Sequence, residues 1–133
     1  GSGKAGEYYF LRAQQDETLD VANIDRTITV PREDGGEGPY DTIGAWMDVQ
    51  RTGGTGWIQV HLRDPSGVSR ACVGFAGGVL PPPSPCPASP AKAQVDYVAG
   101  DWTVTVEVQP GDLATKAAGT VRLVSIYDRS GSV

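Results

Sequence analysis

Residues 55–67, TGWIQVHLRDPSG, are the stretch that decides the predicted fold. Ile58, Val60 and Leu62 alternate with polar residues, which is the period of a strand that buries one face and exposes the other. The Asp-Pro-Ser-Gly end favours a tight turn, because proline fixes its own φ and glycine accepts a positive φ. The stretch therefore predicts a central strand followed by a turn.

The same alternation recurs along the chain and predicts further strands. The cleanest case is DWTVTVEVQ at 101–109, where Trp102 and three valines share one face that we expect in the core. Residues 14–23 are expected to be a turn-prone segment with room for one helical turn, and residues 112–118 a short helix or a loop. The other expected strands are residues 7–12, 25–30, 42–51, 68–75, 93–98 and 119–127. We therefore predict an all-β fold, an antiparallel β-sandwich or jelly roll of about seven to eight strands.

The connection into the central strand, residues 53–56, is Gly-Gly-Thr-Gly. A short glycine-rich connection between two alternating segments is typical of a β-hairpin. We therefore expect residues 42–51 and the central strand to be neighbours in one sheet.

Length and composition indicate a single domain. The chain has 133 residues, with 18 glycines and ten prolines, which favours many short strands joined by turns. Residues 1–6 resemble a flexible linker or the remnant of an expression tag, so the domain is expected to span residues 7–133. Residues 77–92 contain six prolines and predict an extended loop, because proline has no N–H for a helix or a central strand.

Charge and hydropathy argue against two classes of partner. The net charge is −5 and no basic run is present, so we expect no nucleic-acid partner. No run of 18 apolar residues predicts a membrane-spanning segment, and no signal-peptide pattern is visible. A larger secreted or surface protein, carrying an anchor or another domain elsewhere, is compatible with this chain.

The two cysteines, Cys72 and Cys86, bracket the proline-rich segment. A disulfide between them would staple a loop that cannot form regular structure by itself, and it would place the protein in an oxidising, extracytoplasmic compartment: secreted, periplasmic or cell-surface. The alternative is two unrelated thiols. Zinc is disfavoured, because only His61 is available as a third ligand and the usual paired spacing is missing.

Side chains suited to catalysis or to metal binding are sparse. His61, the only histidine, is expected on the solvent face of the central strand without a local nucleophile or orienting carboxylate, so we predict no enzyme activity and no required cofactor. Four acidic residues in or after one loop are weak calcium candidates, because calcium takes oxygen ligands from flexible loops. They are Glu33, Asp34, Glu37 and Asp41, and the alternative is an ordinary solvated acidic loop.

The aromatic residues are the stronger candidates for a binding site. On the expected hairpin Trp46 and Trp57 lie near one another on a sheet face, with Gln59 and His61 beside them. Such a face suits a protein interface or stacking against sugars. The alternative is that residues 32–40 or the proline-rich loop cover this face, which would make the tryptophans part of a satellite core.

Three segments carry a resemblance to known domains: IQVHLRDPSG at 58–67, GDWT at 100–103 before a valine-rich strand, and the glycine-led strand GTVRL at 119–123. Together they resemble the jelly-roll P-domain of proprotein convertases and the bacterial pre-peptidase C-terminal domain, over about residues 25–128. The resemblance implies an accessory domain of a secreted protein. The aspartate-rich calcium segment of P-domains is here Gly56-Trp57, so calcium binding is not carried over.

These observations favour a non-catalytic, extracytoplasmic β-sandwich module that mediates protein–protein interaction or assembly within a larger secreted or surface protein. The alternative is a carbohydrate-binding module that uses exposed tryptophans and takes a polysaccharide as its partner.

Overall fold

The computed structural model describes residues 8–22, 25–30, 40, 42–78 and 80–130 of the chain. The four acidic residues considered as calcium ligands, Glu33, Asp34, Glu37 and Asp41, lie outside these ranges, as does the linker-like segment 1–6. The calcium prediction therefore stays a prediction.

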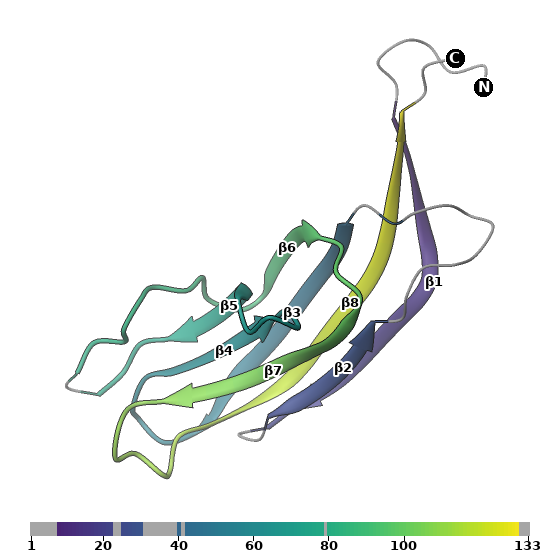
Figure 1. The fold of residues 1–133 in the computed structure, drawn as a ribbon. Coiled ribbons are helices and arrows are strands. Elements are labelled where there is room, and N and C mark those ends of the chain that lie inside the picture. Colours follow the sequence, from purple (N-terminus) through teal and green to yellow (C-terminus); the bar gives the residue numbers. More distant parts are fainter. Residues whose placement is uncertain (1–7, 23–24, 31–39, 41, 79, 131–133) are drawn as a thin grey trace.

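The described residues form eight antiparallel strands in two sheets of four, so the predicted all-β fold is confirmed (Figure 1). The strands are β1 (Tyr8–Val21), β2 (Arg26–Val30), β3 (Thr42–Gly53), β4 (Ile58–Arg63), β5 (Ser69–Phe75), β6 (Ala91–Asp96), β7 (Gly100–Val108) and β8 (Lys116–Ser130). One sheet has the order β1-β8-β3-β6 and the other the order β2-β7-β4-β5. This is the strand order of an eight-stranded jelly roll.

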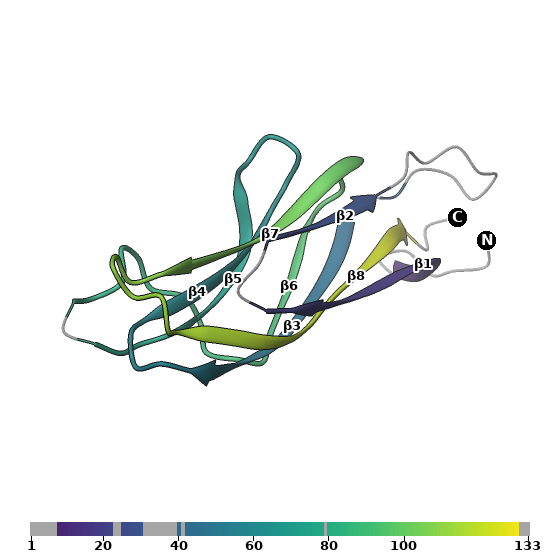
Figure 2. The same ribbon diagram turned by 90° about the horizontal axis from the view of Figure 1, so that it is seen from below.

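The core fills the space between the two layers that Figure 2 shows. Each strand contributes alternate apolar side chains, as in Ile58, Val60 and Leu62 of β4, which are all fully buried. Trp102 of β7 is the largest fully buried side chain, and its Nε1 donates to the Val98 carbonyl at 2.6 Å. The predicted burial of Trp102 is confirmed.

The expected hairpin at residues 53–56 is wrong. β3 pairs with β6 and β8 in one sheet, whereas β4 pairs with β5 and β7 in the other, so this connection crosses between the layers. Two hydrogen bonds hold the crossover: Gly56 N–H donates to Thr115 Oγ1 (3.1 Å) and Arg51 Nη1 to the Gly56 carbonyl (2.6 Å). A short glycine-rich connection fits a hairpin and a corner between sheets equally well, and the long-range pairing of β3 with β8 decides between them.

Residues 14–23 also differ from the expectation, because β1 continues as a strand to Val21 without a helical turn. β8 extends over residues 116–130 and supplies backbone partners along the whole of β1, with a shift of register between Arg12 and Asp16. A polar segment therefore becomes a strand because a long partner lies beside it. Of residues 112–118, where a short helix or a loop was expected, residues 112–115 form a loop and residues 116–118 already belong to β8.

The predicted turn after the central strand is confirmed, with Gly67 at a φ of 88° and its N–H donating to the Asp64 carbonyl (2.8 Å). Its main organiser is Asp64, whose side chain is 3% exposed. The carboxylate accepts the N–H groups of Ser66 (2.9 Å) and Val68 (3.0 Å) and binds Arg70 Nε at 2.9 Å. Burial acts to raise the pKa of Asp64, but the hydrogen bonds from Val68, Arg70 and Ser66 outweigh it, so the pKa lies below the ordinary value.

This turn gives the domain an acid-sensitive element. Because the pKa of Asp64 is lower in the folded than in the unfolded chain, its contribution is present above the ordinary value of 3.8 and is lost as the pH falls through the folded pKa. We expect Asp64→Asn to destabilise the domain most at neutral pH and progressively less as the solution is acidified. Urea unfolding of both proteins at a series of pH values measures this difference. A difference that does not change with pH would assign the effect to packing rather than to charge.

Candidate functional site

Three connections meet at one end of the sandwich, opposite the end at which β1 begins and β8 ends (Figure 1). They are the crossover 53–57, the proline-rich loop 76–90 and the turn 109–115, and we call this region the loop end. Hydrogen bonds join them: Gln109 N–H donates to the Trp57 carbonyl (3.1 Å), and Arg51 Nη2 to the Ala76 carbonyl (2.8 Å). The loop end is therefore a connected surface built from distant parts of the sequence.

The proline-rich loop is fastened to both sheets. On β5 it is held by the disulfide Cys72–Cys86, with the two Cα atoms 5.6 Å apart, and by Gly74 N–H donating to the Pro87 carbonyl at 2.9 Å. On β3 of the other sheet, Ser89 Oγ accepts the Val49 N–H at 2.8 Å. The predicted disulfide is present, and it helps fix a loop that closes over one face of the sandwich.

Trp57 lies under this loop and does not form an exposed binding surface. It is 5% exposed, which agrees with the alternative that the proline-rich loop covers this face. Its Nε1 has no hydrogen-bond partner among the described residues, and the same holds for Gln109 Oε1 at the loop end. The indole borders a hollow of about 590 Å³ whose other lining residues are Leu80, Pro81, Pro83, Glu107, Val108 and Pro110.

Trp46 lies on β3, in the other sheet, so the two tryptophans do not share a face. This corrects the expectation that they form one aromatic surface, and the reason is the crossover between β3 and β4. Trp46 is partly exposed and the Arg122 guanidinium lies over its ring, 6.0 Å from the centroid. Trp46 borders a separate hollow of about 460 Å³ whose lining includes the polar residues Asp48 and Lys92.

His61 and Gln59 alternate with the core residues of β4 as predicted, but they are covered rather than exposed. Gln59 is 1% and His61 8% exposed, because the Gln59 amide donates to the Ser84 carbonyl of the proline-rich loop above it. His61 Nε2 contacts Gln59 Oε1 at 3.0 Å, and Nδ1 contacts Ser69 Oγ at 2.7 Å. An amide oxygen only accepts, so Nε2 carries the proton of the neutral ring and Nδ1 accepts from the Ser69 hydroxyl.

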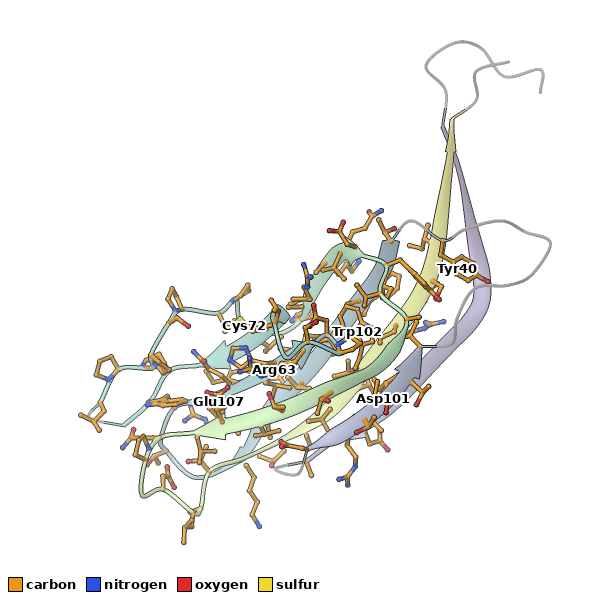
Figure 3. All side chains as sticks on the ribbon, viewed as in Figure 1. Tyr40, Arg63, Cys72, Asp101, Trp102 and Glu107 are labelled. Atoms are coloured by element: carbon orange, nitrogen blue, oxygen red, sulfur yellow. A yellow bond between two sulfur atoms is a disulfide. The ribbon has the colours of Figure 1, made fainter. Side chains whose placement is uncertain are left out.

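A charged pair borders this buried histidine. Arg63 Nη2 binds Glu107 Oε2 at 2.7 Å (Figure 3). The same carboxylate oxygen lies 3.6 Å from His61 Nε2. Burial lowers the pKa of His61, Glu107 raises it and Arg63 lowers it, so the pKa lies below the ordinary value. The surroundings therefore favour the neutral ring and a structural role beneath the loop.

His61 thus makes stability depend on pH near neutrality. The unfolded chain, with a pKa of about 6.5, takes up a proton before the folded protein does, so stability is full above that value and is lost as the pH falls through the folded pKa. We expect the free energy of unfolding to decrease between about pH 7.5 and about pH 5.5, and His61→Gln to reduce this slope. Urea unfolding at both pH values gives the slopes. An equal slope in the variant would show that other groups carry the dependence.

Three potential metal-ligand atoms also gather here, since one each from His61, Cys72 and Cys86 lie within 4.8 Å of one another. The two sulfur atoms are bonded to each other and are not thiolates, so the cluster is not a zinc site in this state. It is explained by the pairing of His61 with Cys72 across β4 and β5.

Among the described residues, no helix is long and apolar enough to cross a membrane. Comparison of the chain with protein-family models, with curated proteins and with solved structures gave no match.

Proposed function

We propose that this domain is a non-catalytic, extracytoplasmic module that mediates protein–protein interaction or assembly within a larger secreted or surface protein, and that it meets its partner through the loop end. The observation that carries the proposal is the placement of two exposed leucines. Leu80 on the proline-rich loop is 52% exposed and Leu113 on the 109–115 turn is 91% exposed. Leu80 lines the hollow beside Trp57, and exposed apolar side chains at an apolar hollow are typical of an interaction surface.

The composition and the rigidity of the loop end both favour the free energy of binding a partner. Partner binding would remove the leucines and the proline rings from water, which is the main favourable contribution to association. Loops normally lose conformational freedom on binding, and this cost is reduced here because the disulfide and the contacts of Pro87 and Ser89 already hold the loop. The partner expected from this chemistry is a protein surface with an apolar centre.

The disulfide supports the extracytoplasmic part of the proposal, since such bonds persist in oxidising compartments. The non-catalytic part is supported by the single histidine, which is buried with both ring nitrogens in hydrogen bonds. The relation to accessory domains of secreted proteases stays a prediction from the sequence.

Site-specific photo-crosslinking in the cells that produce the protein tests the proposal. A photoreactive amino acid at position 80 or 113 should join the domain to a discrete protein partner. Val68 is the matched control, because it is 51% exposed and lies in the turn between β4 and β5, at the far end of β5 from the loop. Equal products at all three positions, or none at positions 80 and 113, would contradict the proposal.

A second function, binding of a polysaccharide, has one observation in its favour. Trp46 is partly exposed and borders a hollow of about 460 Å³ that also has Asp48, Lys92 and Arg122 in its walls. Sugars stack on such rings while polar neighbours bind their hydroxyl groups. Affinity electrophoresis through gels containing soluble polysaccharides would detect retardation of the domain, which Trp46→Ala should abolish and Val68→Ala should not.

A further inference from the structure

Strand β6 (Ala91–Asp96) forms one border of its sheet, because β3 pairs with it on one side only (Figure 1). The side toward which each N–H and C=O group of β6 points can be deduced from the hydrogen bonds of its neighbour β3. Val49 N–H points toward the β6 side, where it donates to Ser89 Oγ at 2.8 Å, and N–H groups alternate along a strand. Met47, Ala45 and Ile43 therefore also point toward β6.

Their partners on β6 are Ala91, Ala93 and Val95, whose backbone groups are used within the sheet. The N–H and C=O groups of the alternate residues Lys92, Gln94 and Asp96 must then point outward, away from β3. No backbone partner for them occurs among the described residues. Such a free edge is a template for another strand.

The sequence of β6, AKAQVD, is complementary to itself in one antiparallel register. When two copies are paired about Gln94, Lys92 lies opposite Asp96 of the second copy and Asp96 lies opposite Lys92 of the second copy. Both side chains are exposed and neither has an ion-pair partner among the described residues. Opposite charges directly across a strand pair are stabilising, and like charges are destabilising.

The backbone and the inner face of β6 agree with this register. The residues that meet across the axis, Lys92, Gln94 and Asp96, are those with outward N–H and C=O groups, so each pair forms the hydrogen-bonded kind of antiparallel pair. On the inner face Ala93 lies opposite Val95 of the second copy, so small apolar side chains meet. The charges, the backbone groups and the apolar residues thus select the same arrangement.

We infer that the protein forms a two-fold symmetric dimer in which β6 pairs with β6 of a second copy, centred on Gln94. The two four-stranded sheets then join into one continuous sheet of twice the width. A two-fold axis requires each patch to match itself, which is the property that the β6 sequence has. This surface is separate from the loop end, so the inference does not depend on the proposed partner there.

Charge reversal tests the pairing directly. Lys92→Glu places a carboxylate opposite Asp96 of the second copy on both sides of the axis, and Asp96→Lys places two amines opposite each other. Sedimentation equilibrium of the wild-type protein should show a concentration-dependent dimer, and each single variant should weaken it by about tenfold or more. Lys116→Glu, at an exposed lysine at the start of β8, has the same charge change and should leave the dimer unchanged.

Two combinations of these substitutions distinguish a specific Lys92–Asp96 pairing from a general effect of net charge on association. The double variant Lys92→Glu/Asp96→Lys restores opposite charges and should dimerise like the wild type. An equimolar mixture of the two single variants should form a heterodimer, because both cross-axis pairs are then attractive. Circular dichroism of every variant checks that the fold is kept.

Three outcomes would overturn the inference: a monomeric wild-type protein at millimolar concentration, single variants that dimerise like the wild type, or a mixture that fails to associate. A cysteine crosslink gives an independent reading of the register. Gln94→Cys brings two thiols together at the axis and should oxidise to a covalent dimer much faster than Asp101→Cys, an exposed position on β7. Equal rates for the two cysteines would likewise contradict the inferred pairing.

Discussion

Replacement of Trp102 by alanine should lower the free energy of unfolding by about 3–5 kcal/mol, the range typical of large-to-small substitutions in a packed core. Trp102 has no exposed surface and packs between the two sheets. The substitution removes the largest fully buried side chain and also leaves the Val98 carbonyl without its indole donor. Urea unfolding followed by far-ultraviolet circular dichroism measures the loss without relying on tryptophan fluorescence.

Trp102→Phe is the matched variant, because it keeps an apolar ring and removes the Nε1–H. It should cost less than alanine but more than a substitution at the surface, since the Val98 carbonyl loses its donor. A loss of less than about 1 kcal/mol for Trp102→Ala would contradict the packing described for the core.

Removal of the disulfide should lower the free energy of unfolding by about 3 kcal/mol, because the bond closes a loop with a sequence separation of 14 residues. Cys72→Ala/Cys86→Ala is the appropriate variant, since alanine leaves no reactive thiol. The loop would then be held mainly by the Ser84, Pro87 and Ser89 contacts, and the surface below it would become more accessible to water.

The local consequence of this change can be measured at His61. Because burial is the largest cause of its lowered pKa, loosening the loop should move the pKa back toward the ordinary value. Titration of the His61 ring resonances by NMR in both proteins measures this movement. If stability falls while the pKa of His61 stays the same, the disulfide does not help to hold the loop over this face.

Strand positions followed well from the sequence, whereas the assignment of strands to sheets did not. Alternation around Ile58 and Trp102 marks which face of a strand is apolar, and this is a local property that short windows reveal. The neighbour of a strand in a sheet can be far away in the sequence. β3 lies beside β8, whose residues follow it by more than sixty positions, and the sequence of residues 42–53 does not indicate this pairing. The glycine-rich sequence at residues 53–56 therefore predicts a hairpin, although this connection crosses between the sheets.

Only the local features of the candidate site could be predicted from the sequence, because its burial depends on contacts between distant segments. The disulfide could be predicted because the only two cysteines of the chain bracket a proline-rich loop that cannot form regular structure by itself. The burial of Trp57, Gln59 and His61 did not follow, because it depends on where the proline-rich loop lies in space. Prolines exclude regular structure, but they do not encode which surface the loop covers. The role of Asp64 could have been predicted, because an aspartate at the first position of a turn commonly accepts backbone N–H groups.

The pairing of β1 with β8 determines how the domain would respond to mechanical load. Tyr8 lies opposite Ser130 at one end of the ladder and Val21 opposite Gly119 at the other. Tension applied between the two termini therefore acts on the Tyr8–Ser130 end first and breaks the backbone pairs one after another, instead of shearing them all together. In such an unzipping geometry each backbone pair bears the load in turn, and β1 and β8 are the first strands to separate. A protein that transmits tension through this domain would lengthen early, whereas one that holds it by a single terminus would not strain it.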